Sequence, residues 1–221
     1  MSKALERLGV MLGDVDNLLD YHPAAKTPVR GRPPGDLKPL LRSCVVLTYA
    51  AWEVYVEDSM IEAAESIAGS ASGSVEVPAA LRAFVASRCK DPWCLAGDGW
   101  RKTITDAVTE RVRGDEATTF GINTAGPKQV SNLHRELLGV DLLKQCEWKN
   151  WPNTKVRSEL ALLVKVRGKI AHAGTTPGRL DLKGTREWRD FIDRLTRTLD
   201  GRLSGWLASR PESPVPVPAV A

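Results

Sequence analysis

Apolar side chains recur every three or four residues through most of the chain, which is the period of amphipathic α-helices. No segment alternates with a period of two for long enough to indicate a β-sheet. The pattern predicts helices over residues 3–20, 37–68, 79–88, 100–112, 127–138, 154–173 and 185–208. Asn153 is the expected N-cap of the helix over 154–173, and Gly139 and Gly174 are expected to end the helices before them. We therefore expect an all-α helical bundle, in which the long helix over 37–68 packs at the centre.

Glycine, serine and proline interrupt the helical pattern at two places that bear on domain organisation. Gly69 to Ser74 form a flexible linker after the long helix. Residues 70–126 carry the weakest helical pattern, and we expect an extra helical and loop insertion there, in the middle of one domain over residues 1–208. Residues 209–221 form a Pro-rich tail with four prolines in its last eleven residues. This composition predicts a disordered segment.

Charge is unevenly distributed along the chain. The formal net charge is +4, and the segment from Lys155 to Lys169 alone carries five cations and one acid. Between Arg42 and Glu65 the balance reverses, with five acids and one cation. The basic and acidic helices could pair with each other. Alternatively, the basic helix could face RNA or DNA.

The sequence also argues against several classes of protein. No run approaches the roughly 20 apolar residues of a membrane span, and the first residues lack the apolar core of a signal peptide. The four cysteines lack the spacing of a disulfide framework or of a zinc site. We expect a cytoplasmic protein with free thiols, no membrane contact, no metal and no cofactor.

Arg167-Gly168-Lys169-Ile170-Ala171-His172 places an arginine and a histidine five residues apart near the end of the basic helix. The planar arginine cation fits phosphate oxygens, and histidine has an ordinary pKa close to neutral pH. RNA cleavage without a metal needs a base, an acid and cations that stabilise the charged phosphorane. One chain offers one well-placed histidine, and about 140° of helix rotation separates it from the arginine. This chemistry favours a homodimer with a composite site.

Arg167 to His172, together with the following Gly174, resembles the Arg-x4-His motif of HEPN-domain proteins. The segment from Cys44 to Glu57, which contains Tyr49-Ala50-Ala51-Trp52-Glu53, looks like the long second helix of the RiboL-PSP-type HEPN subgroup. Leu133 to Gly139 and the final helix also fit that layout, so the resemblance covers residues 3–208. It implies a compact α-helical bundle. Many proteins of this kind are metal-independent ribonucleases of toxin–antitoxin and phage-defence systems.

The resemblance also implies roles for individual residues. Arg167 would stabilise the phosphate, and His172 would act as acid or base, in a cleft between two protomers. The family often has a polar residue, commonly Asn, directly after the arginine, whereas this chain has Gly168. The implied protein is a homodimeric endoribonuclease that cleaves RNA as a toxin or phage-defence effector, with an antitoxin or another defence-system protein as a further partner.

Other interpretations of the same residues stay open. The chain could be a non-catalytic HEPN module that dimerises and binds a partner in such a system, or a helical scaffold with a chance motif. Glu53 could support the site or form a structural salt bridge with the basic helix. Lys165 and Lys169 could contact RNA backbone or belong to a solvated face.

The tryptophans divide into two groups. Trp52, Trp188 and Trp206 fall at core spacing, which indicates packing. Trp148 and Trp151 flank the loop that enters the basic helix, and they are the tryptophans to test for RNA contact.

Overall fold

The computed structural model describes residues 1–23, 37–115, 121–122, 124–175 and 180–210. Within these ranges the chain forms seven α-helices and no β-strand, which confirms the predicted all-α bundle. The helices are α1 (Lys3–Asp20), α2 (Lys38–Ser70), α3 (Ala79–Arg88), α4 (Gly99–Arg113), α5 (Pro127–Leu138), α6 (Asn153–Ala173) and α7 (Leu182–Ala208). Three short 3-10 helices lie between them: η2 (Ser74–Glu76), η3 (Pro92–Leu95) and η4 (Leu143–Gln145).

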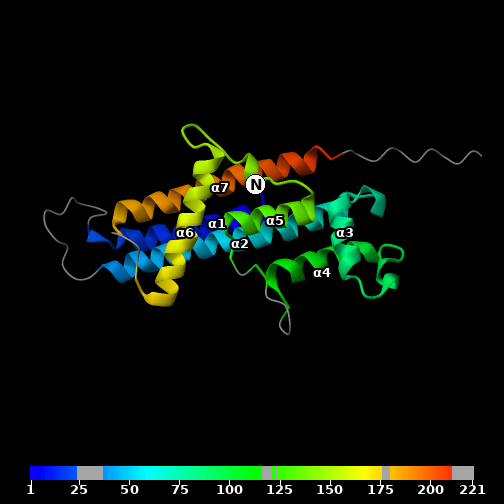
Figure 1. Cartoon of the computed structure of the whole chain (residues 1–221), viewed down its shortest axis with the longest axis horizontal. Coiled ribbons are helices and arrows are strands. Elements are labelled where there is room, and N and C mark those ends of the chain that lie inside the picture. Colours follow the sequence, from blue (N-terminus) through cyan, green and yellow to red (C-terminus); the bar gives the residue numbers. More distant parts are fainter. Residues whose placement is uncertain (24–36, 116–120, 123, 176–179, 211–221) are drawn as a thin grey trace, which may run out of the picture.

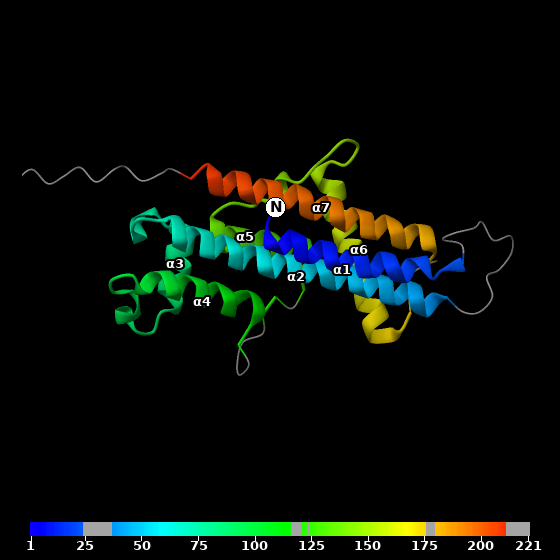
Figure 2. The same ribbon diagram turned by 180° about the vertical axis from the view of Figure 1, so that it is seen from behind.

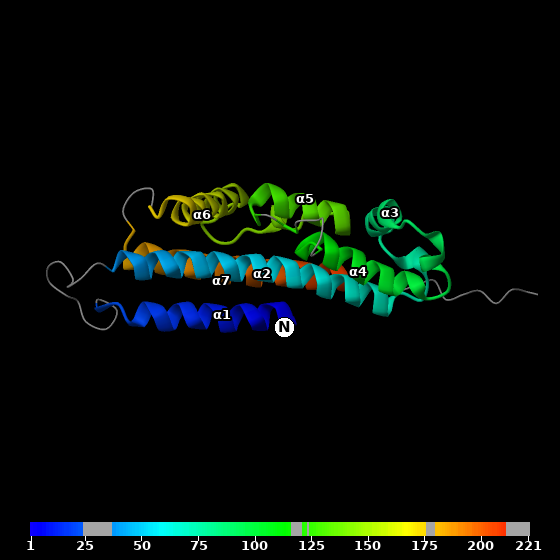
Figure 3. The same cartoon turned by 90° about the horizontal axis from the view of Figure 1, so that it is seen from below.

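The long helix α2 is the central element of the bundle. Its 33 residues give it a length of about 50 Å, and it contacts α1, α4, α6 and α7 (Figure 1). Figure 3 shows α1 on one side of α2 and α7, and α5 and α6 on the other. The same order is visible from behind in Figure 2, where α1 lies in front of α2. Fifteen residues of α2 are buried, as expected of a helix that packs against several neighbours.

The acidic residues of α2 mostly contact helices other than the basic one. Asp58 accepts hydrogen bonds from Arg7 of α1 at 2.9 Å and from Arg113 of α4 at 2.6 Å. Glu62 accepts from the backbone N–H of Ala4 at 2.6 Å, which satisfies a donor at the start of α1. Among the described residues, Glu53 is the one acid of α2 that pairs with the basic helix α6. Direct pairing of the two helices is therefore limited to this contact.

The middle region shares the core of the bundle. Leu81 and Phe84 of α3 and Trp100 and Ile104 of α4 are buried in the same apolar cluster as α2. The helices of this region were expected over 79–88 and 100–112, and α3 and α4 match these ranges within one residue. Its interpretation as an insertion stays a prediction. Of the expected tail, residues 211–221 lie outside the described residues.

The largest differences from the sequence prediction lie at the end of α2 and at the starts of α6 and α7. Helix α2 runs to Ser70, two residues into the expected linker. Asn153 was expected to cap the basic helix, but it is the first residue of α6, and its side chain donates to the carbonyls of Leu143 and Cys146. These carbonyls belong to the segment before the helix, so Asn153 fixes the entry into α6. Helix α7 begins earlier than expected because the Asp181 carboxylate accepts from Gly184 N–H at 2.9 Å.

Candidate functional site

Arg167 lies where α6 crosses α2. Val156, Leu160 and Leu163 form the buried face of α6, and Arg167 continues this face toward α2. Its Nη2 atom lies 3.7 Å from Oε2 of Glu53, and its guanidinium carbon lies 5.2 Å from the ring centroid of Tyr49. The Arg167 side chain is 34% exposed, so the guanidinium is held by α2 and still reaches solvent.

A chain of hydrogen bonds places the partners of Arg167. The Trp52 indole N–H donates to the Ala125 carbonyl at 2.7 Å, and the Ala125 N–H donates to the Tyr49 hydroxyl at 3.0 Å. The Tyr49 side chain in turn hydrogen-bonds Glu53. Tyr49, Trp52 and Ala125 are buried. The segment before α5 thereby holds Tyr49 and Glu53 in position beside Arg167.

Glu53 and Tyr49 both titrate away from their ordinary values. Burial raises the pKa of the Glu53 carboxyl, and the hydrogen bond from Tyr49 and the charge of Arg167 partly oppose this rise. Burial also raises the pKa of Tyr49, and the nearby Glu53 carboxylate raises it further. Tyr49 is therefore a neutral hydrogen-bonding partner at physiological pH.

His172 lies in the last turn of α6, where its side chain is exposed. Among the described residues it takes part in no hydrogen bond or ion pair. The rotation of about 140° over five residues turns it away from the α2-facing surface that carries Arg167. Arg42 of α2 closes the helix end beside it, because Nη1 of Arg42 donates to the Gly174 carbonyl at 2.9 Å. Gly174 has a φ of 62°, the left-handed conformation expected of a helix stop.

The other predicted site residues lie on the open side of α6. Lys165 and Lys169 are exposed, and neither has an acidic partner among the described residues. Gly168 is helical, and a Cβ atom added there would meet nothing within 4 Å. The structure thus brings Glu53 and Arg167 together, and leaves His172, Lys165 and Lys169 on solvent-facing positions.

The space around Gly168 leads to a prediction about stability. Gly168→Ala should stabilise the protein by about 0.5–1 kcal/mol, because alanine lowers the backbone entropy lost on helix formation. Urea denaturation measures the gain. Gly201→Ala in α7 is the matched variant, since its added Cβ also meets nothing, whereas Gly99→Ala should destabilise because its Cβ would clash with the Cys94 carbonyl. A loss of stability in Gly168→Ala would contradict an open position.

Tyr49 and Arg42 were not singled out as site residues from the sequence. One signal could have found Tyr49, because Tyr49 and Glu53 are four residues apart and therefore share one face of a helix. Arg42 and Ala125 had no such signal, since only the fold brings them to the site.

His134 and three of the tryptophans pack inside the bundle. His134 is 1% exposed, and burial lowers its pKa to about 4. Trp52 is fully buried, and Trp188 and Trp206 pack against the core, which confirms the packing interpretation. Trp148 and Trp151 lie at the opposite end of α6 from His172.

Neither a metal-binding cluster nor a membrane-spanning helix is found among the described residues. These residues contain no group of three or more His, Cys, Asp or Glu side chains arranged to hold a metal ion. None of the described helices combines the length and apolar character needed to cross a membrane.

Comparison with known proteins identifies the family. The sequence profile described as RiboL-PSP-HEPN matches residues 13–205, a range that includes α2, α6 and the Arg167–His172 motif. No curated protein and no solved structure matches the chain. The family match supports a nuclease or RNA-related role. Because the match spans most of the sequence and agrees with the helical layout, the chain belongs to the RiboL-PSP-type HEPN family.

Proposed function

We propose that this chain is a cytoplasmic, metal-independent endoribonuclease that acts as a toxin or phage-defence effector. The observation that carries the proposal is the placement of Arg167, fixed by Glu53 and Tyr49 and still 34% exposed. A cation held in this way can meet a phosphate without reorganising, which is the condition under which electrostatic catalysis is most effective. His172, exposed one helical turn and a half further along, supplies a proton-transfer group.

In the proposed mechanism, Arg167 binds the scissile phosphate through its planar fork and stabilises the charge of the phosphorane. His172 transfers the proton, either from the 2′-OH or to the leaving oxygen. Lys165 and Lys169 contact neighbouring phosphates from the open side of α6. Glu53 is a positioning residue, because it touches Arg167 and not the substrate.

The proposed site is completed by a second copy of the chain. Arg167 faces α2 while His172 faces solvent, so the two groups of one protomer do not converge on one phosphate. A partner whose α6 packs against the first α6 adds a second histidine and a second arginine. Leu162 is 44% exposed on α6, and burial of its side chain in such a contact would add to the stability of the dimer.

The proposal is tested with purified protein and a single-stranded RNA in EDTA. Cleavage products and a dimeric mass in sedimentation are the expected results. Intact RNA after prolonged incubation with dimeric protein would argue for the second candidate, a non-catalytic module that dimerises and binds a partner of a defence or toxin–antitoxin system. Gly168 favours this candidate, because it lacks the polar side chain common after the arginine. Toxicity of the expressed protein that His172→Ala removes would favour the enzyme.

Glu53→Gln should have opposite effects on RNA cleavage and on the free energy of unfolding. We expect the rate of RNA cleavage to fall about tenfold, because small displacements of a positioned group cost up to about 100-fold. We expect the free energy of unfolding to rise. Burial raises the pKa of Glu53 above its ordinary 4.5, so the folded protein holds this proton more tightly than the unfolded chain. The wild type therefore loses stability as pH rises above about 4.5, and Gln avoids this loss.

Urea denaturation at about pH 4 and about pH 7 measures the second effect. The advantage of Glu53→Gln over the wild type should grow toward pH 7. Glu57→Gln is the matched control, since Glu57 lies one turn further along α2, its pKa is also raised by burial, and Arg167 is not among its partners. It should leave cleavage unchanged. Equal loss of cleavage in both variants would remove the positioning role of Glu53.

A further inference from the structure

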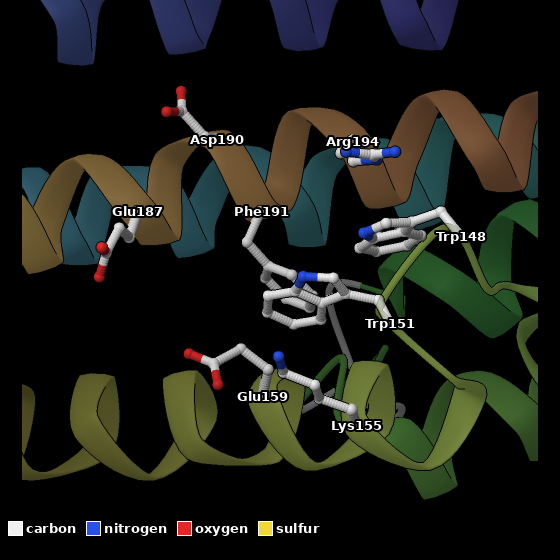
Figure 4. A pocket seen from close by; sticks show the side chains of 8 residues that line it. All are labelled: Trp148, Trp151, Lys155, Glu159, Glu187, Asp190, Phe191 and Arg194. Carbon is white, nitrogen blue, oxygen red and sulfur yellow. The ribbon is translucent and has the colours of Figure 1, made fainter.

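A groove of about 470 Å³ lies between α6 and α7, at the end of α6 opposite His172. Its floor is aromatic (Figure 4). The rings of Trp148 and Trp151 are stacked with centroids 5.6 Å apart, and Trp151 stacks on Phe191 of α7 at 5.5 Å. Trp148 and Trp151 are both half-buried, so part of each indole reaches solvent in the groove.

The backbone fixes this aromatic floor. Trp148 and Trp151 exchange two backbone hydrogen bonds, of 2.8 and 3.1 Å, across the turn that precedes α6. The turn closes because Asn150 adopts a φ of 66°, a conformation that asparagine tolerates. Phe191 is buried and anchors the two indoles to α7. The rings are therefore held in place before any ligand arrives.

Two cations lie over the indole rings. Nζ of Lys155 is 4.2 Å from the ring centroid of Trp151, and the guanidinium carbon of Arg194 is 5.2 Å from that of Trp148. Both side chains are exposed, and neither forms an ion pair with another described residue. Among the described residues, the ring contact is thus the side-chain interaction that each cation makes.

The three carboxylates of the groove, in contrast, already have partners. Glu159 accepts from the Trp188 indole N–H at 2.8 Å. Glu187 lies 3.8 Å from Lys183, and Asp190 lies 3.4 Å from Arg189. Three charges of the groove have no oppositely charged partner among the described residues, namely Lys155, Arg194 and Glu159. Their sum is positive, which favours an anionic ligand over a cationic peptide.

We propose that this groove binds one nucleotide of a single-stranded RNA, with the base on the Trp151 ring and the adjacent phosphate between Lys155 and Arg194. The inference rests on the proposed ribonuclease function and names a substrate-holding position for it. Lys155 moves from the ring to the phosphate, and the base takes its place on the indole. This exchange is favourable because a base stacked on the Trp151 indole interacts with it more strongly than the Lys155 cation does. The carboxylates beside the ring accept hydrogen bonds from base N–H groups.

The position of the groove fits a strand that continues to the proposed cleavage site. Lys155 and Arg167 are twelve residues apart on α6, which is about 18 Å along the helix. A few nucleotides of extended single strand cover this span. Lys165 and Lys169 lie on the open side of α6 near its Arg167 end. Lys165 would contact a phosphate within this span, and Lys169 would contact one beyond Arg167.

Binding is measured with the His172→Ala protein, which keeps the groove intact, and a fluorescein-labelled single-stranded oligoribonucleotide in EDTA. Trp151→Leu should weaken binding roughly tenfold, and Trp151→Phe, which keeps a ring, should weaken it less. Lys155→Gln and Arg194→Gln should each weaken binding and lower the slope of log affinity against log salt by about 0.7. These two side chains are exposed, so their variants fold even if Trp151→Leu does not.

The control variants replace a tryptophan and a lysine that lie away from the groove. Trp93→Leu and Lys102→Gln change side chains that are 82% exposed and distant from the groove, and both should bind RNA as the parent protein does. Equal affinity for AMP and for the oligonucleotide would overturn the RNA assignment in favour of a free nucleotide. Indole quenching by a hexa-arginine peptide but not by RNA would overturn it in favour of a cationic protein partner.

The outcomes for the groove and for the proposed function are distinct. If the variants at Trp151, Lys155 and Arg194 bind RNA normally while the wild-type protein cleaves RNA, the proposed role of the groove is wrong and the proposed ribonuclease function stands. Binding that depends on Trp151, in a wild-type protein that leaves RNA intact, would support the groove and overturn the ribonuclease.

Discussion

Arg167→Ala and His172→Ala are each expected to abolish measurable RNA cleavage in EDTA. A positioned proton-transfer group contributes about 10²–10⁴ to a rate, and loss of one electrostatic stabiliser costs about 10²–10³. Arg167→Ala should also leave the half-buried Glu53 without its cation. Initial rates on a labelled single-stranded RNA measure both losses.

Two further variants sharpen this expectation. Arg167→Lys keeps the charge but loses the planar fork, so it should recover only a small part of the activity. An equal mixture of Arg167→Ala and His172→Ala protomers should stay inactive, because a mixed dimer holds a single histidine and the reaction needs both a base and an acid. Lys102→Gln, exposed on α4, is the control for altered charge. Full activity in either alanine variant would refute the proposed site.

Trp52→Ala is expected to produce the largest loss of stability. The Trp52 side chain is 0% exposed, and large-to-small substitutions of buried aromatics cost about 3–5 kcal/mol. The change also leaves the Ala125 carbonyl without its donor at 2.7 Å. This cost is a large fraction of the total free energy of unfolding, which is about 5–15 kcal/mol for native proteins. The melting temperature should fall by about 10 °C.

Comparison of two replacements distinguishes packing from hydrogen bonding at this position. Trp52→Phe keeps most of the apolar volume and loses the indole N–H, so it should cost less than Trp52→Ala. It should still lower RNA cleavage, because Ala125 positions Tyr49, which bonds Glu53. Trp93→Ala, 82% exposed, should stay within about 0.5 kcal/mol of wild type. Equal melting temperatures for the two alanine variants would contradict the central role of Trp52.

Local patterns in the sequence predicted the helices well. The 3.6-residue period identified all seven, and the boundaries of α1 and α3 agree with the prediction to the residue. Gly139 and Gly174 were expected to end helices, and both have a positive φ. Caps were less predictable, because Asn153 can cap a helix or bond the preceding loop, and only tertiary contacts with Leu143 and Cys146 decide between these roles.

The surroundings of the candidate site could be predicted only in part. The motif identified Arg167, and charge patterning identified Glu53 as a partner for the basic helix. Ala125 contacts Tyr49 across 76 residues of sequence, and no periodicity carries such information. The aromatic groove is similar, because Trp148 and Trp151 come from a connecting turn and Phe191 from α7. The sequence indicated RNA contact for the two tryptophans, but not the ring that anchors them.

The orientation of α6 makes the proposed activity depend steeply on the concentration of the protein. Its arginine faces the body of the protomer and its histidine faces away from it, so under the proposed mechanism an isolated copy lacks a working site. When most copies are separate, the number of pairs rises with the square of the number of copies. A tenfold rise in synthesis would then raise cleavage about a hundredfold. Such a protein could be harmless at low expression and destructive after induction, with no other regulator required.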